Sequence, residues 1–72
     1  MNPEDLKEGN TYVFLMLSTP NSPVIYTGTA KGINDGGKIF DPEQTFYVFY
    51  NLNTKFLIYA KEEELPYYVK SI

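Results

Sequence analysis

The stretch TFYVFYNL, residues 45–52, constrains the fold more than any other part of the chain. Nearly all of its residues are aromatic or β-branched, a composition that favours a strand over a helix. A strand with one face in solvent alternates apolar and polar residues, whereas here Tyr47 and Phe49 lie between other apolar residues. The pattern predicts a central β-strand with one face in the core and a second apolar face left over.

Four further segments have the composition of strands and are bounded by turn-forming residues: 11–17, 24–33, 56–60 and 67–72. Gly28 and Gly32 interrupt the second of them, as glycines do where a strand bends or bulges. Residues 51–55 form a short segment suited to a hairpin turn. We therefore expect residues 45–52 and 56–60 to pair as antiparallel strands.

The segments between the strands read as turns or single helical turns. Residues 18–23 form a loop on composition because they contain two prolines, and residues 34–38 form a turn that requires positive φ. A further turn is expected at Asp41 and Pro42. Residues 2–5 and 61–65 each predict one helical turn, the first of them capped by Asn2.

This order of elements resembles the small SH3-like barrels, a group that includes Tudor-like and KOW-like domains. Two segments carry the resemblance: LKEGN at residues 6–10, followed by Tyr12 and Phe14, and IYAKEEEL at residues 58–65. The resemblance implies an all-β fold in one domain spanning residues 1–72. It would be a small five-stranded SH3-like barrel with one short helical turn before the last strand.

The resemblance also implies which side chains point inward and which lie outside. The inward residues would be Leu6, Tyr12, Phe14, Ala30, Val48, Tyr50, Ile58, Ala60 and Leu65. An aromatic patch on two adjacent strands would then consist of Tyr47, Phe49, Leu57 and Tyr59. A Tudor-type cage for methylated lysine or arginine needs aromatic residues and an acid or amide that converge, and Tyr47, Tyr50 and Asn51 are available for one.

The charged residues disfavour duplex nucleic acid as a partner. All six cations are lysines, they are scattered along the chain, and the net charge is −3. Bidentate recognition of phosphates and of guanine edges depends chiefly on arginine, which the chain lacks.

The chain contains no histidine and no cysteine, so it lacks the side chains most often used to activate nucleophiles and to bind transition metals. Asp35, Asp41 and Glu43 fall in one long loop and are expected to be solvated turn residues. We therefore expect no enzymatic activity, no catalytic residues, no cofactor and no metal.

Three features favour a soluble cytoplasmic protein. The absence of cysteine fits a reducing compartment. The first residues, MNPED, lack the basic and apolar regions of a signal peptide, and no apolar run approaches the length of about 20 residues needed to span a membrane. We expect no membrane partner.

Seven tyrosines and five phenylalanines are too many to be buried completely in so short a chain. We therefore expect a non-enzymatic interaction module in which Tyr47, Phe49, Leu57 and Tyr59 bind a protein partner or a second copy of the chain. Its size would also suit a small accessory or inhibitor protein. The alternative is a protein that binds single-stranded nucleic acid by stacking aromatic rings on bases.

Overall fold

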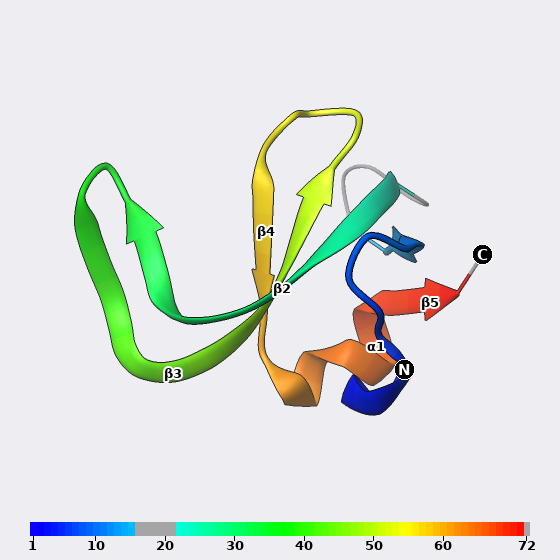
Figure 1. Cartoon of the computed structure of the whole chain (residues 1–72), viewed down its shortest axis with the longest axis horizontal. Coiled ribbons are helices and arrows are strands. Elements are labelled where there is room, and N and C mark those ends of the chain that lie inside the picture. The colour runs from blue at the N-terminus through cyan, green and yellow to red at the C-terminus, as the bar shows by residue number, and fades with distance from the viewer. Residues whose placement is uncertain (16–21, 72) are drawn as a thin grey trace.

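A computed structural model describes residues 1–15 and 22–71 and contains one five-stranded antiparallel sheet (Figure 1). The strands lie in the order β4-β3-β2-β1-β5. Their bounds are β1 Thr11–Phe14, β2 Ser22–Asp35, β3 Lys38–Asn51, β4 Leu57–Ala60 and β5 Val69–Ser71. The described residues also contain three short helical segments: η1 Pro3–Asp5, η2 Glu62–Glu64 and α1 Leu65–Tyr68. None of the helices in the described residues has the length and apolar character to cross a membrane.

The five strands and the short helix before the last one were predicted, whereas the length of the second and third strands was not. β2 and β3 each have 14 residues and form one long hairpin. The turn predicted at Asp41 and Pro42 is wrong, since both residues lie within β3. Much of the predicted loop 18–23 and the end of the predicted strand 11–17 lie outside the described residues.

The first helical turn forms where the sequence predicts it, but the predicted cap is wrong. Asn2 stands at the N-cap of η1 without a capping hydrogen bond from its side chain within the described residues. The turn is tied to β1 instead by Tyr12, whose hydroxyl accepts from the Lys7 N–H at 2.9 Å and donates to the Asp5 carbonyl at 3.3 Å. Leu6 follows as the expected core anchor.

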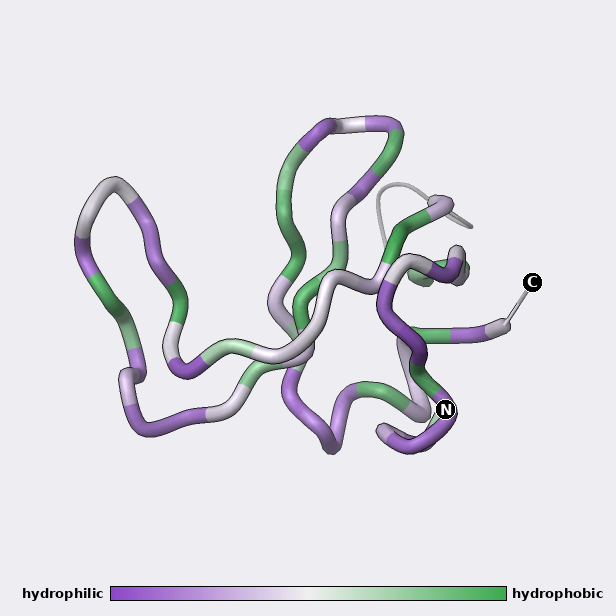
Figure 2. The backbone as a smooth tube through the Cα atoms, in the orientation of Figure 1, coloured by the Kyte–Doolittle hydropathy of each residue, from purple (hydrophilic) through white to green (hydrophobic). Residues whose placement is uncertain are grey.

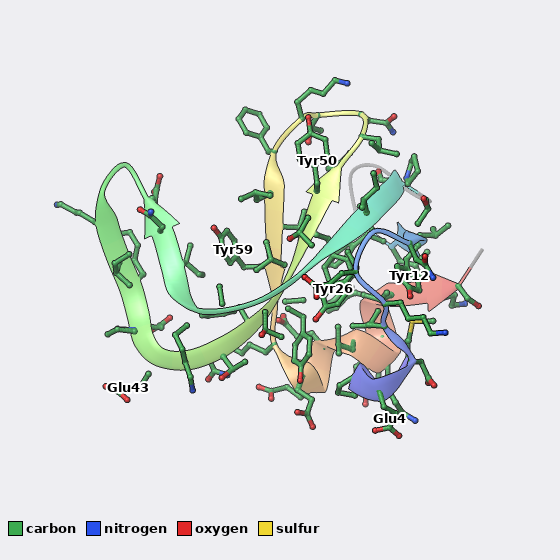
Figure 3. The ribbon with its side chains drawn as sticks, in the orientation of Figure 1. Glu4, Tyr12, Tyr26, Glu43, Tyr50 and Tyr59 are labelled. Carbon is green, nitrogen blue, oxygen red and sulfur yellow. The ribbon has the colours of Figure 1, made fainter. Side chains whose placement is uncertain are left out.

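The core lies between the curled sheet and the helical segments, and Phe49 of β3 is at its centre. Phe49 is 0% exposed, and its ring lies 5.9 Å from that of Phe14 and 5.3 Å from that of Tyr26. The other buried members of this cluster are Leu6, Tyr12, Val24, Ala60, Leu65 and Val69. Figure 3 shows Tyr12 and Tyr26 directed among these elements.

The inward set implied by the barrel resemblance is therefore correct in part. Ala30 is exposed, because the part of β2 that carries it has already left the core. Tyr50 is half-buried and lies on the opposite face from Phe49, whereas Ile58 is half-buried but packs against the core cluster as expected. Val48 is buried but lies on the opposite sheet face from Phe49, its neighbour in a strand where side chains alternate.

The far half of the β2–β3 hairpin bends sharply away from the sheet at Gly32 (Figure 1). Lys31 pairs with Thr45 and Ile33 pairs with Phe40, so Gly32 alone faces residues 41–44. A second irregularity, at Thr27 and Gly28, lies closer to the core. These bulges turn the end of the hairpin, residues 33–40, into a separate projection that we call the hairpin arm. Figure 2 shows hydrophilic residues along its bend.

Replacing Phe49 by alanine should lower the free energy of unfolding by about 3–5 kcal/mol, because it leaves a cavity among fully packed rings. Phe56→Ala is the matched control, since the Phe56 side chain is 74% exposed and its loss should cost less than about 0.5 kcal/mol. Urea unfolding followed by circular dichroism measures both. Equal losses in the two variants would contradict the assignment of Phe49 to the core.

The bend should depend on space at Gly32 as well as on its backbone angle. Gly32 has φ +78°, and a Cβ there would lie 2.7 Å from Ile39 Cγ2 and 3.0 Å from the Phe40 carbonyl oxygen. Gly36 at the tip of the arm has φ +60° and nothing within 4 Å of such a Cβ. Asparagine tolerates positive φ, so Gly36→Asn should change stability by only a few tenths of a kcal/mol, whereas Gly32→Asn should cost about 1–3 kcal/mol. Thermal unfolding of the two variants measures the difference; equal effects would remove the steric explanation.

Candidate interaction site

The four residues predicted to form one aromatic patch are divided between the two faces of the sheet. Tyr47 and Phe49 lie on the core face, where Phe49 is fully buried and Tyr47 packs against the core cluster. Leu57 and Tyr59 lie on the other face, because Tyr59 pairs directly with Val48 and directly paired residues share a face. The expectation that all four are exposed together is wrong.

A cage built from Tyr47, Tyr50 and Asn51 does not form either. Tyr50 is on the opposite face from the other two, since side chains alternate along a strand. Asn51 is 1% exposed, and its Oδ1 accepts hydrogen bonds from the N–H groups of Asn53 at 2.8 Å and Thr54 at 3.2 Å. Asn51 thus shapes the turn between β3 and β4.

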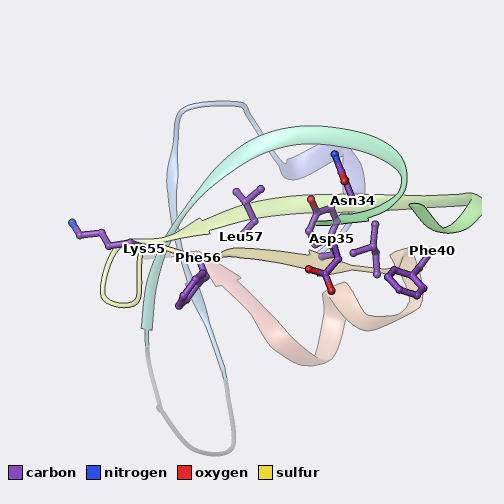
Figure 4. A pocket seen from close by; sticks show the side chains of 8 residues that line it. Asn34, Asp35, Phe40, Lys55, Phe56 and Leu57 are labelled. Atoms are coloured by element: carbon purple, nitrogen blue, oxygen red, sulfur yellow. The ribbon is translucent and has the colours of Figure 1, made fainter. Parts of the chain in front are cut away.

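The outer face of the sheet, the face that bears Val48, Leu57 and Tyr59, carries an open hollow of about 510 Å³ (Figure 4). We call it the outer hollow. The hairpin arm forms one wall, and β4 with the turn before it forms the other. Figure 3 shows Tyr59 between β4 and the arm. The lining residues are Ile33, Asn34, Asp35, Phe40, Lys55, Phe56, Leu57 and Tyr59.

Large apolar side chains line this hollow while remaining open to solvent. Phe40 and Leu57 are each 50% exposed, and Phe56 is 74% exposed. On the same face Phe46 is only 2% exposed, and its ring meets that of Tyr59 edge-on with centroids 6.0 Å apart. The hollow therefore combines exposed apolar walls with a tyrosine that is held in place by a buried ring.

The charges of the hollow are sparse and of both signs. Figure 4 shows Lys55 at one end of the hollow and Asp35 further along it, before Phe40, which lies at the other end. In the described part of the chain, no group of three or more histidine, cysteine, aspartate or glutamate side chains is placed to hold a metal ion. The hollow thus offers mainly apolar surface, with one cation and one carboxylate along its length.

Two tyrosines near the core have raised pKa values. Burial raises the pKa of Tyr26, and the neighbouring Tyr47 and Glu8 raise it further. For Tyr47, burial again raises the pKa most, followed by the charge of Glu62, whose Oε1 accepts a hydrogen bond from the Tyr47 hydroxyl at 3.5 Å. Both phenols are thus held neutral by the folded structure.

Comparison with known protein families, with curated proteins and with solved structures finds no match to this chain. The candidate site is therefore argued from its own geometry.

Phe40 and Phe56 were not predicted as site residues, although they contribute much of the exposed apolar surface. Each stands beside turn-forming residues, Phe40 before Asp41 and Phe56 after Lys55. An aromatic residue beside turn-forming residues was the signal available in the sequence. The bend of the hairpin at Gly32 brings Phe40 near β4. The angle of that bend cannot be predicted from the sequence.

The raised tyrosine pKa values predict a loss of stability at alkaline pH. The pKa of each phenol is higher in the folded chain than the ordinary 10.0, so the stabilisation is complete below about pH 10 and is lost as the pH rises through the folded-state values. Thermal unfolding between about pH 9 and about pH 11 should show a smaller fall in Tm for the double variant Tyr26→Phe/Tyr47→Phe than for the wild type. Tyr67→Phe, at a side chain that is 73% exposed, is the control and should follow the wild type. Identical curves for all three proteins would contradict the prediction.

Proposed function

We propose that the protein is a non-enzymatic interaction module that binds a protein partner through the outer hollow. The observation that carries the proposal is the convergence of Phe40, Phe56 and Leu57, each at least half exposed, on one hollow. Single exposed apolar residues are ordinary, whereas a contiguous group marks a contact surface. A module of this kind acts by occupying a partner's surface, as small accessory or inhibitor proteins do.

The energetics favour a modest but specific contact. Complete burial of one such side chain is worth about 1.5–3 kcal/mol, and these three begin half exposed or more. Large apolar and aromatic anchors that enter a partner's pocket commonly supply most of the binding energy of an interface. The hollow therefore offers several kcal/mol from a small number of residues, before the cost of association.

We also propose that the sheet belongs to the SH3-like group. The strand order β4-β3-β2-β1-β5, the bent second strand and the short helix before β5 support this assignment. Because such folds carry many unrelated functions, the assignment adds nothing to the choice of partner.

The charge of the outer hollow favours a protein over single-stranded nucleic acid. A groove that follows a phosphate backbone is lined by several cations, whereas this hollow has one cation, Lys55, and one carboxylate, Asp35. The chain as a whole has a net charge of −3. Stacking on the exposed rings would thus be opposed by electrostatic repulsion.

Phe56→Asp should weaken partner binding by at least about tenfold, because it places a charge in the apolar contact. Crosslinking and affinity capture from the source cells, quantified against the wild type, measure this loss. Tyr67→Asp is the matched control, because Tyr67 is 73% exposed but does not line the hollow. A partner retained equally by Phe56→Asp and by the wild type would contradict the proposal. Binding of a single-stranded oligonucleotide at low salt that Phe56→Asp abolishes would instead support nucleic acid as the ligand.

A further inference from the structure

β4 lies at the edge of the sheet and lacks the proline or charged residue that protects many edge strands. In the order β4-β3-β2-β1-β5, β4 has a neighbour on one side only, and in the described residues no strand pairs with its other side. Its residues 57–60, LIYA, include no proline and no charge. Natural edge strands commonly carry one or the other, because their free backbone groups attract further strands.

The direction of the backbone groups on β4 follows from the hydrogen bonds of β2. Tyr26 donates its N–H to the Asn10 carbonyl at 3.1 Å and accepts from the Gly9 N–H at 2.8 Å, so both its groups point away from β3. Tyr26 and Phe49, its partner in β3, therefore form a non-hydrogen-bonded pair. The N–H and carbonyl of Phe49 thus point toward β4.

The alternation then fixes which residues of β4 have outward backbone groups. Ile58 pairs with β3 at Phe49, so its backbone groups point inward. The Asn51 N–H donates to the Phe56 carbonyl at 2.9 Å, so Phe56, two residues before Ile58, also directs its carbonyl toward β3. Leu57 and Tyr59, which alternate with these residues, direct their N–H and carbonyl groups outward.

The open edge ends where the strand ends. The next outward N–H along the chain is that of Lys61, and Glu64 Oε1 accepts its hydrogen bond at 2.8 Å. The donors of the edge are thus those of Leu57 and Tyr59. The side chains of the same two residues line the outer hollow.

We propose that the occupant of the outer hollow is a single extended segment of a partner protein, which adds to the sheet as a sixth strand beside β4. This proposal rests on the proposed function and specifies its binding mode. The segment pairs with the outward N–H and carbonyl groups of Leu57 and Tyr59. Its alternate side chains enter the hollow against Ile33 and Phe40 on the opposite wall.

The charges around β4 favour a separate segment over a second copy of the chain. Two copies that satisfied all these edge groups would pair about a two-fold axis at Ile58, which brings Lys55 of one copy close to Lys61 of the other, just beyond the ends of β4. Like charges that approach each other across paired strands oppose the pairing. A separate segment with an acidic residue near Lys55 and a basic residue near Asp35 instead complements both charges of the hollow.

The edge can be tested first in the protein alone. Hydrogen exchange of the dilute protein, followed by NMR, should show fast exchange for the amides of Leu57 and Tyr59. The amides of Ile58 and Ala60, which face β3, should exchange at least about tenfold more slowly. Protection of all four amides in the monomer would overturn the proposal.

The second test adds two heptapeptides with an acetylated N-terminus and an amidated C-terminus. Both contain the central sequence Val-Thr-Val-Thr-Val; one begins with lysine and ends with glutamate, and the other has these two terminal residues exchanged. At millimolar concentration, one of the two peptides should slow exchange of the Leu57 and Tyr59 amides by at least about tenfold. The control peptide is N-methylated at the residues that would pair with the edge and should give no protection. Phe56→Asp should weaken binding of the active peptide.

The outcomes separate this proposal from the proposed function. Peptide binding that Phe56→Asp weakens, with the Leu57 and Tyr59 amides still unprotected, overturns strand addition and leaves the outer hollow as a contact surface. No binding of either peptide also overturns strand addition, while loss of a captured partner in Phe56→Asp would still support the proposed function. Protection that appears without peptide as the protein concentration rises would show that a second copy, and not a separate segment, covers the edge.

Discussion

The burial of Phe49 is the interaction on which the rest of the structure depends. Its ring packs against Phe14 of β1 and Tyr26 of β2, so one side chain joins three adjacent strands. Because side chains alternate along a strand, this packing also decides that Val48, Tyr59 and Leu57 face the other way. The outer hollow is a consequence of how the core is filled. A one-residue change of register would exchange the two faces.

The same alternation explains how much could be predicted from the sequence. Five strands, the bends at Gly28 and Gly32 and the short helix before β5 were predicted, because composition and turn residues are local signals. The choice of face was not, since both faces of residues 45–52 are apolar and either could enter the core. Leu57 and Tyr59 lie on the sheet face away from Phe14 and Leu65, whereas Tyr47 and Phe49 lie on the same face as that core cluster.

The hairpin arm was missed for a different reason. Two glycines at its tip and a proline in β3 just beyond the arm look like a loop, and a proline in a strand argues against a central position in a sheet. The structure accommodates Pro42 at a bulge, where residues 41–44 face Gly32 alone and no regular ladder has to be maintained. Asp41 takes a positive φ of 51° at the same place. The site depends on this irregular joint, which brings Phe40 toward β4, and periodicity carries no information about it.

The division between arm and core has an evolutionary meaning. No residue of the arm belongs to the core cluster, and the arm is joined to the sheet through a bulge. Substitutions, insertions or deletions at its tip would therefore change the shape of the outer hollow while leaving intact the packing on which folding relies. A scaffold with this property can vary one surface quickly, since selection on that surface and selection for a stable chain act on different residues.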